Sequence, residues 1–292
     1  PNFMDPDPEC GSAAARFARA GIITLVFSSC SYYKTESGSS LKKTVAAGSP
    51  APVEQVKKET AKKAAVKKKA KTIYLTFDDG PNKGTRNMMD IIRDEQVPVT
   101  LFIVGQHVYG SREQAAIFDS IINCRYFEIA NHSFTHGWGN KYAKFYTIPD
   151  SAAKDFIRCA DSLKLTSNII RLPGRNIWRT AGVSSTDISA SKAAADSLFG
   201  KGFIEVGWDI EWHFDADMKL KNSSDELIRQ IDSVFACCKT KTPDHLILLA
   251  HDQVYAKSGD SAELRQFIKK LKARDEYNFE VVSKYPDLKK GD

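Results

Sequence analysis

The stretch Ile73-Tyr74-Leu75-Thr76-Phe77-Asp78-Asp79-Gly80-Pro81 places two adjacent carboxylates where an apolar, strand-like run ends at a turn. Adjacent carboxylates repel each other, so a cation, an arginine or a proton is expected nearby. Taken alone, a turn with solvated acids explains the stretch equally well, because Asp and Gly are ordinary turn residues. The rest of the chain has to decide between a functional site and a plain turn.

Two histidines follow a second strand-like run, in the segment Asn131-His132-Ser133-Phe134-Thr135-His136. On one helical turn, imidazoles four residues apart would lie on the same face and could bind one ion. Histidine pairs with this spacing also occur by chance on many helices. Combined with an upstream carboxylate, the pair predicts a two-histidine, one-carboxylate metal site with open positions for water.

Strand-like and helical patterns alternate from residue 72 onward, which predicts parallel β/α units. Seven apolar, β-branched runs are typical of strands: 72–77, 99–104, 127–130, 168–172, 203–208, 245–250 and 278–282. Helical patterns lie between them, at 85–95, 151–163, 187–198, 225–238 and 261–273. The candidate polar residues fall at the C-terminal ends of different strands, where barrel enzymes build their active sites.

Five segments, in this order, resemble the motifs of the NodB-type polysaccharide deacetylases, carbohydrate esterase family 4. The first two are the aspartate and histidine segments quoted above. The other three are Arg171-Leu172-Pro173-Gly174-Arg175, Trp208-Asp209-Ile210-Glu211-Trp212 and Ile247-Leu248-Leu249-Ala250-His251-Asp252. The resemblance covers about residue 71 to the C-terminus. It implies an α/β fold, a distorted (β/α) barrel of about seven parallel strands.

The resemblance also implies roles for the first three motifs. Asp79, His132 and His136 would hold a divalent metal ion, zinc or alternatively cobalt. Asp78 would act as the general base, with Arg171 orienting it and keeping it ionised. Singly, each residue has an ordinary structural explanation, such as a surface salt bridge or a loop acid. Their joint occurrence in the order of the family motifs favours a functional site over these structural explanations.

His251 of the fifth motif would protonate the leaving amine, because an amide does not easily expel an amine anion. Asp209 is the first choice as the carboxylate that holds this imidazole cationic. The fourth motif, however, is one residue shorter than the family's Asp-x-x-Asp-Trp pattern. Either Asp209 or Glu211 could therefore partner His251.

Four further residues are expected to contact the substrate. Leu249 would line a pocket for the acetyl methyl group, and Trp212 would wall the sugar groove, since aromatic faces suit the apolar faces of pyranose rings. After Pro173 the family often has Tyr-Gly, whereas this chain has Gly174-Arg175. Gly174 can still offer its backbone N–H to the oxyanion.

A lysine-rich linker is expected ahead of the barrel. Residues 41–71 contain ten lysines and two glutamates, so the net charge of +6 for the 292-residue chain leaves −2 for everything else. Residues 41–71 contain no aromatic residue and have little to bury, so they are predicted to be disordered or transiently helical, and the linker is assigned to 31–71. Such a tract is more often a solvated spacer than a nucleic-acid site, so no specific nucleic-acid partner is expected.

An export signal is predicted at the N-terminal end. Arg16 and Arg19 precede an apolar run, 20–27, that is too short to span a bilayer and ends in Ser28-Ser29-Cys30. This order resembles a bacterial lipobox, in which a lipidated Cys30 would attach the protein to a membrane. A simple secretory signal and an uncleaved anchor are the alternatives. The predicted organisation is an N-terminal extension and signal-like segment in 1–30, the linker in 31–71 and the deacetylase domain in 72–292.

Together these observations predict an exported hydrolase of the cell envelope, lipid-anchored or otherwise periplasmic or secreted. It would use a divalent metal to remove N-acetyl or O-acetyl groups from an acetylated glycan such as peptidoglycan or a chitin-like N-acetylglucosamine polymer. The alternative is a catalytically silent glycan-binding module on the same fold. Loss of a metal ligand or of His251 would favour that alternative, and none is missing. A nucleic-acid-binding protein is disfavoured because the rest of the chain is nearly neutral.

Overall fold

The computed structural model describes residues 71–288. The predicted signal segment, Cys30 and all but the last residue of the predicted linker lie outside the described residues. None of the helices in the described range is long and apolar enough to cross a membrane.

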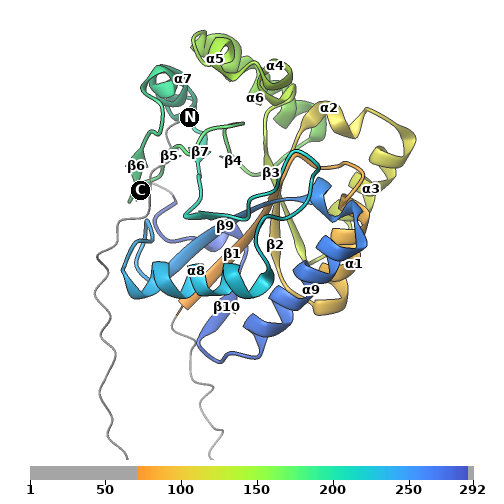
Figure 1. Cartoon of the computed structure of the whole chain (residues 1–292). Helices are drawn as coiled ribbons and strands as arrows, with labels where there is room; N and C mark the ends of the chain where they lie inside the picture. The colour runs from red at the N-terminus through yellow and green to blue at the C-terminus, as the bar shows by residue number, and fades with distance from the viewer. Residues whose placement is uncertain (1–70, 289–292) are drawn as a thin grey trace, which may run out of the picture. The chain divides into compact units, whose positions relative to one another are not determined.

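One mostly parallel sheet organises the fold (Figure 1). Its strands in the described range are β1 (Lys71–Asp78), β2 (Val99–Ile103), β3 (Phe127–Asn131), β4 (Ile169–Ile170), β5 (Trp178–Arg179), β6 (Ser184–Ser185), β7 (Ile204–Glu205), β8 (Ile210–Glu211), β9 (His245–His251) and β10 (Tyr277–Phe279). Their order is β6-β5-β7-β4-β3-β2-β1-β9-β8, with β10 paired to the start of β1. Only β5 runs antiparallel to its neighbours. The structure confirms the predicted distorted (β/α) barrel, and it adds that the barrel is not closed, because the two outer strands of the described sheet, β6 and β8, do not pair with each other.

Helices connect the strands and cover the sheet. The described α-helices are α1 (Thr85–Glu95), α2 (Gly105–Val108), α3 (Arg112–Ile122), α4 (His136–Asn140), α5 (Tyr142–Phe145), α6 (Pro149–Leu163), α7 (Lys192–Gly200), α8 (Ser224–Ala236) and α9 (Ser258–Lys272). Three 3₁₀ turns are η1 (Ser189–Ser191), η2 (Asp252–Ala256) and η3 (Val282–Lys284). In Figure 1, α8 and α9 lie in front of the sheet, α1 lies beside α9, and α4 to α6 lie at the top.

All seven predicted strands coincide with observed ones, but two are much shorter than expected. The runs at 168–172 and 203–208 contain only the two-residue strands β4 and β7. Beyond those strands the backbone carbonyls of Val206 and Gly207 accept hydrogen bonds from the Arg171 side chain, so a buried side chain takes the place of ladder partners. The five predicted helices correspond to α1, α6, α7, α8 and α9, although α7 begins only at Lys192, after η1.

The central strand β1 brings the candidate site together. It pairs with β9 along its length, so that Thr76 lies opposite Leu249 and Asp78 opposite His251. On its other side Asp78 is level with Phe102 of β2. Because parallel strands end at the same edge of a sheet, the polar residues that follow them meet at one end of the barrel.

Candidate metal and catalytic site

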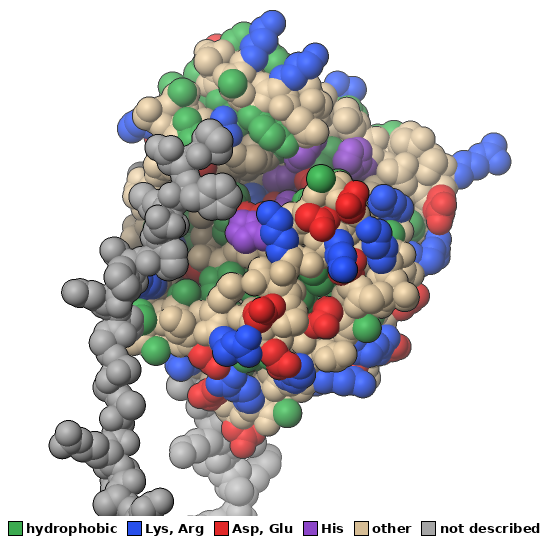
Figure 2. Space-filling view, in the orientation of Figure 1, with side chains coloured by type: hydrophobic (Ala, Val, Ile, Leu, Met, Phe, Trp, Pro, Cys, Tyr) green, Lys and Arg blue, Asp and Glu red, His purple; other side chains and the backbone are tan. Residues whose placement is uncertain are grey.

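A pocket of about 240 Å³ opens at this end of the barrel. Figure 2 shows histidine side chains in the hollow between the upper and lower parts of the molecule. The residues that line the pocket come from many different connections: Asp78, Asp79, His132, His136, Tyr142, Gly174, Asp187, Trp208, Glu211, Leu249 and His251. The structure therefore brings together most of the residues that the sequence nominated.

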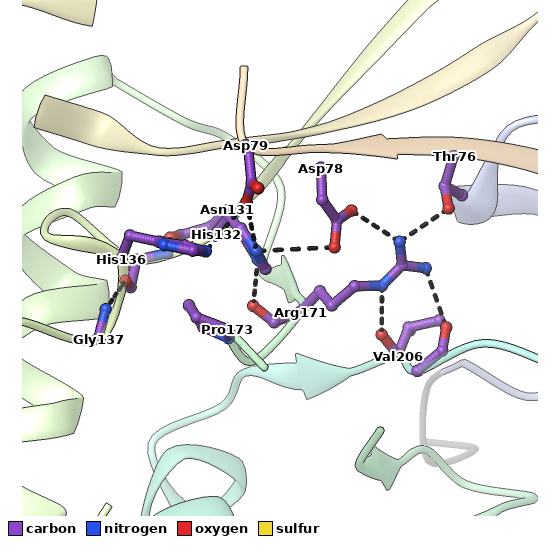
Figure 3. A network of polar contacts seen from close by, with 12 residues as sticks. Thr76, Asp78, Asp79, Asn131, His132, His136, Gly137, Arg171, Pro173 and Val206 are labelled. Atoms are coloured by element: carbon purple, nitrogen blue, oxygen red, sulfur yellow. Dashed lines mark hydrogen bonds and ion pairs between the residues drawn. The ribbon is translucent and has the colours of Figure 1, made fainter. Parts of the chain in front are cut away.

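Asp79, His132 and His136 form a cluster with the composition and spacing of a metal site (Figure 3). Their candidate ligand atoms lie within 4.8 Å of one another. The Asp79 Oδ1 atom is 3.0 Å from Nε2 of His136 and 3.5 Å from Nε2 of His132. The three side chains thus converge on one point at the rim of the sheet.

Both imidazoles are oriented by bonds to their far nitrogens. Nδ1 of His132 lies 2.9 Å from the backbone carbonyl of Arg171, and Nδ1 of His136 lies 2.6 Å from Oδ1 of Asn140. Since both partners are acceptors, each Nδ1 carries the proton and donates it. Each Nε2 is then left with a lone pair directed at the cluster, the arrangement typical of metal-bound histidines.

The expectation that the two histidines share one helical turn is wrong. His132 directly follows β3, and all five residues of α4, from His136 to Asn140, have positive φ angles of 52° to 68°. The segment is therefore a left-handed turn, a conformation that Gly adopts most easily. At Gly137 a Cβ atom would lie 2.8 Å from Cδ1 of Tyr142, so close packing as well as backbone angle requires glycine there.

The cluster fits a divalent cation. Asp79 Oδ1 is buried and makes no hydrogen bond, although two imidazole nitrogens face it at short range. Burial alone would raise the pKa of Asp79, but the facing His132 and His136 outweigh it and hold the pKa well below its usual range. A buried carboxylate oxygen without a proton donor and two imidazole lone pairs directed toward it are the donor set that zinc or cobalt takes.

Asp78 is a second buried carboxylate, and Arg171 holds it in place. The Arg171 Nη1 atom donates to Asp78 Oδ1 at 2.8 Å and to the Thr76 hydroxyl at 2.7 Å. The rest of the guanidinium donates to backbone carbonyls of the segment that follows β7 and stacks 4.0 Å from the Phe102 ring. Burial lowers the pKa of Arg171, while Asp78 favours its charged form. The free oxygen, Oδ2, faces Nε2 of His132 at 3.6 Å.

His251 also lines the pocket, at the end of β9 and level with Asp78 of the neighbouring strand. Its Nδ1 atom is buried and has no hydrogen-bond partner, and its ring packs edge-on against Phe214 at 5.1 Å. The carboxylate that shares the pocket with it is Glu211. Burial would raise the pKa of Glu211, but His213, His251 and Arg171 together outweigh it and lower this pKa.

The first-choice partner of His251 is corrected by this geometry. Both carboxylate oxygens of Asp209 accept backbone N–H groups at 2.7 Å, from Lys241 and Ile247. Ile247 is four residues before His251, which is about 13 Å along a strand. Burial raises the pKa of Asp209 to about 6. Asp209 therefore anchors the start of β9, and Glu211 is the acid that faces the pocket.

Two of the four predicted substrate contacts line the pocket. Leu249 and Gly174 do so. Pro173 is buried outside it, with its carbonyl accepting the Tyr146 hydroxyl at 2.8 Å. Trp212 is wrongly predicted, because it is 1% exposed and donates from Nε1 to the Asn222 carbonyl. Alternation along β8 sends Glu211 to the pocket and Trp212 to the opposite face, under the helices.

Three residues that line the pocket were not predicted as site residues: Tyr142, Asp187 and Trp208. Trp208 belongs to a quoted motif, so its position beside Asp209 was a usable signal. Tyr142 lies in a four-residue helix without periodicity, and Asp187 lies in an irregular connection. Their roles depend on the tertiary path of the chain.

A buried carboxylate braces the loop that follows β1. Asp252, 2% exposed, accepts hydrogen bonds from Nδ2 of Asn82 and the hydroxyl of Thr85. Burial raises the pKa of Asp252 to about 7, while these two donors lower it. Since Asp252 directly follows His251, the brace ties the aspartate loop to the end of β9.

Comparison with known proteins finds a family match for part of the chain. Residues 65–173 match the family model for polysaccharide deacetylases. This part of the chain is similar to the NodB-type polysaccharide deacetylases. It is 28% identical over 148 residues to a chitooligosaccharide deacetylase from Bradyrhizobium sp., a match that covers 48% of this chain and 57% of that relative. The chain thus spans little more than half the length of this curated relative.

Solved structures support the fold. The catalytic domain of a peptidoglycan N-acetylglucosamine deacetylase from Eubacterium rectale superposes with a TM-score of 0.54 at 22% identity, covering 76% of this chain and 93% of that one. A family 4 acetyl xylan esterase from Clostridium thermocellum, in complex with a cobalt ion, gives a TM-score of 0.50 at 22% identity, covering 73% and 89%. These similarities establish the NodB barrel as the fold of residues 71–288.

Proposed function

We propose that this protein is a metal-dependent hydrolase that removes acetyl groups from an envelope or extracellular polysaccharide. The observation that carries the proposal is one pocket that contains a two-histidine, one-carboxylate cluster together with a second carboxylate, Asp78, and a third imidazole, His251. Amide hydrolysis needs these parts: a cation site, a base for water and an acid for the leaving amine.

In the proposed reaction, Asp79, His132 and His136 hold the divalent ion. When bound, the ion supplies Lewis-acid polarisation of the acetyl carbonyl and lowers the pKa of water. Asp78 takes the proton of the attacking water on Oδ2, the oxygen that faces the cluster. Arg171 holds the other oxygen, Oδ1, and so keeps Asp78 ionised and correctly turned.

His251 donates a proton to the nitrogen as the carbon–nitrogen bond breaks. The products are acetate and a free amine on the sugar. Glu211 is the carboxylate placed to favour the cationic form of this imidazole, and its lowered pKa keeps it charged. Gly174 at the rim of the pocket offers a backbone N–H, and Leu249 offers an apolar wall for the acetyl methyl group.

The names of the relatives support the proposed substrate class. Proteins similar to this chain are named as deacetylases of chitooligosaccharide and of peptidoglycan N-acetylglucosamine. We therefore place N-acetylglucosamine polymers first and O-acetylated glycans second, because an acetyl xylan esterase shares the fold. Zinc is the proposed metal and cobalt the alternative, since cobalt accompanies that esterase.

Acetate release from a panel of acetylated glycans, with and without a chelator, tests the proposal. We expect release that stops with the chelator and returns with added zinc or cobalt. His251→Ala should abolish most of the activity, whereas Asp150→Asn, an exposed acid in α6, should not. Glycan binding without acetate release by the metal-loaded wild type would instead favour a silent binding module.

We also propose the cellular placement and the domain boundaries. An envelope polysaccharide lies outside the cytoplasm, so an enzyme acting on it has to be exported. The proposed signal-like segment is 1–30, the linker is 31–71 and the catalytic domain is 72–292, with lipid attachment at Cys30. Labelling with a radioactive fatty acid tests the lipid attachment. The wild type should incorporate the label and Cys30→Ala should not. Absence of label from the wild type would instead favour a simple secretory signal.

A further inference from the structure

A second pocket adjoins the catalytic one. It has a volume of about 500 Å³ and is lined by Asn140, Lys141, Tyr142, Ala143, Lys144 and Arg175. The two pockets share Tyr142, whose ring centroid is 5.7 Å from that of His136. A polymer whose acetamide reaches the candidate metal ligands would place a neighbouring sugar over this second pocket. We call its three cations, Lys141, Lys144 and Arg175, the basic shelf.

Arg175 is held in position without a carboxylate partner. Its Nε atom donates to the Ser191 hydroxyl at 2.8 Å, and its Nη1 atom donates to the Gly174 carbonyl at 2.6 Å. The guanidinium also lies 5.2 Å from the Tyr146 ring centroid and 5.9 Å from that of Tyr142. Between residues 71 and 288 no Asp or Glu forms an ion pair with it. A half-buried cation fixed only by neutral groups is prepared to bind an anion.

The two lysines add to this charge. Lys141 and Lys144 are exposed, and neither forms an ion pair with another described residue. Figure 2 shows Lys and Arg side chains projecting from the α4–α5 part of the surface, above the histidine hollow. Asp187, an acid of the catalytic pocket, accepts hydrogen bonds from the backbone N–H groups of Asn176 and Ile188.

The shelf coincides with a local departure from the family pattern. A Cβ atom at Gly174, where the family often has tyrosine, would lie 2.7 Å from Cε2 of Tyr142, and Gly174 has a φ of +63°. The Tyr142 ring from α5 therefore occupies this space, and Arg175 follows directly. An aromatic surface for a pyranose ring is thus bordered by cations on one side.

We propose that the basic shelf is a subsite for a carboxylate on the sugar next to the acetylated one. The preferred substrate is then an acidic glycan, in which N-acetylglucosamine neighbours a sugar that bears a carboxyl group. Arginine pairs with a carboxylate through two parallel hydrogen bonds, which a neutral ester does not accept equally well. This inference rests on the proposed function, because it concerns the substrate of the same site.

Matched acid and ester substrates test the subsite. One pair is a hyaluronan oligosaccharide, in which glucuronic acid follows N-acetylglucosamine, and its methyl ester. The other pair is N-acetylglucosaminyl-N-acetylmuramic acid with a free lactyl carboxylate, and its methyl ester. At low salt we expect kcat/KM for acetate release to favour the acid about tenfold in at least one pair, the scale of one charge-assisted hydrogen bond. The pair that shows this preference identifies the source of the carboxylate.

Variants assign the preference to the shelf. Arg175→Gln should reduce the acid-to-ester ratio to about twofold or less, and Lys144→Gln should reduce it by a smaller factor. Arg112 is an exposed arginine of α3 that lines neither pocket, so Arg112→Gln should keep the wild-type ratio. Raising the salt concentration should weaken the preference, because exposed charges are screened. Thermal melting of each variant checks that the fold is intact.

The outcomes separate this inference from the proposed function. Equal kcat/KM for acid and ester in both pairs would overturn the shelf while leaving deacetylation intact. If no glycan releases acetate, the proposed function fails, and calorimetric titration with the same four compounds then decides the subsite. Tighter binding of an acid than of its ester, lost in Arg175→Gln, would support the shelf, and equal binding would refute it.

Discussion

Replacing Arg171 with methionine should destabilise the protein severely. The guanidinium is fully buried and donates to Asp78, Thr76 and the carbonyls of Val206 and Gly207. Methionine has a similar length but no donor, so Asp78 becomes a buried charge without a partner. Breaking a buried ion pair by removing one partner costs about 3–5 kcal/mol. We expect a loss of about 4 kcal/mol in the free energy of unfolding.

A double-mutant cycle measured by urea unfolding gives the sharper test. Asp78→Asn alone should destabilise, because it weakens a buried charge-assisted hydrogen bond. In the Arg171→Met background the same change should be neutral or stabilising, since it removes the unpaired charge. We expect a coupling free energy of roughly 2–3 kcal/mol between the two positions. Additive effects, or a loss below about 1 kcal/mol for Arg171→Met, would contradict the assignment of Arg171 as the group that holds Asp78.

Four further predictions address the pocket and the carboxylate of Asp209 behind it. His132→Ala should lose bound metal and activity together, as measured by metal analysis and acetate release, and an unchanged metal content would refute the ligand set. Asp78→Asn should retain the metal but reduce turnover by about 10² or more, the scale of a lost general base. Asp79→Asn should instead weaken metal binding. Identical behaviour of the two variants would contradict the separate roles of base and metal ligand. Glu211→Gln should move the alkaline limb of the pH–rate profile toward lower pH, while Asp209→Asn should leave it in place. Because burial raises the pKa of Asp209 to about 6, its protonated form stabilises the fold below about pH 4, and this contribution is lost as the pH rises through 6. Between about pH 4 and 6 the free energy of unfolding of the wild type should therefore fall by up to roughly 3 kcal/mol, at about 1.4 kcal/mol per pH unit, and Asp209→Asn should remove this fall. An unchanged pH dependence of urea unfolding in the variant would contradict the raised pKa of Asp209.

The long buried strands were predictable because their local pattern and their tertiary environment agree. β1 and β9 are continuous apolar runs that end in polar residues. Both observed strands begin and end within one residue of the predicted bounds. β4 and β7 were predicted too long, since the Arg171 side chain replaces ladder partners that no sequence window contains. β5 and β6 are only two residues long, and β6, Ser184–Ser185, carries no apolar signal.

The candidate site was predictable in its members and less so in its geometry. Asp79, His132 and His136 converge as expected, yet through a left-handed turn instead of a helical face. The partner of His251 required the register of β8 against β9, which decides whether Asp209 or Glu211 faces the pocket. Sequence spacing alone fixes neither a strand's register nor which of its faces is buried.

The Asp252 brace stiffens one wall of the pocket. Asp252 binds Asn82 and Thr85, α1 is tied again where Asn87 donates to the Tyr255 carbonyl at 2.9 Å, and the Gly80 carbonyl accepts the backbone N–H of residue 104. The aspartates and His251 therefore belong to one cross-linked body, so a change at Asp252 should disturb both sides of the reaction centre together. In hydrogen exchange, amides of the braced loop should be among the slow ones.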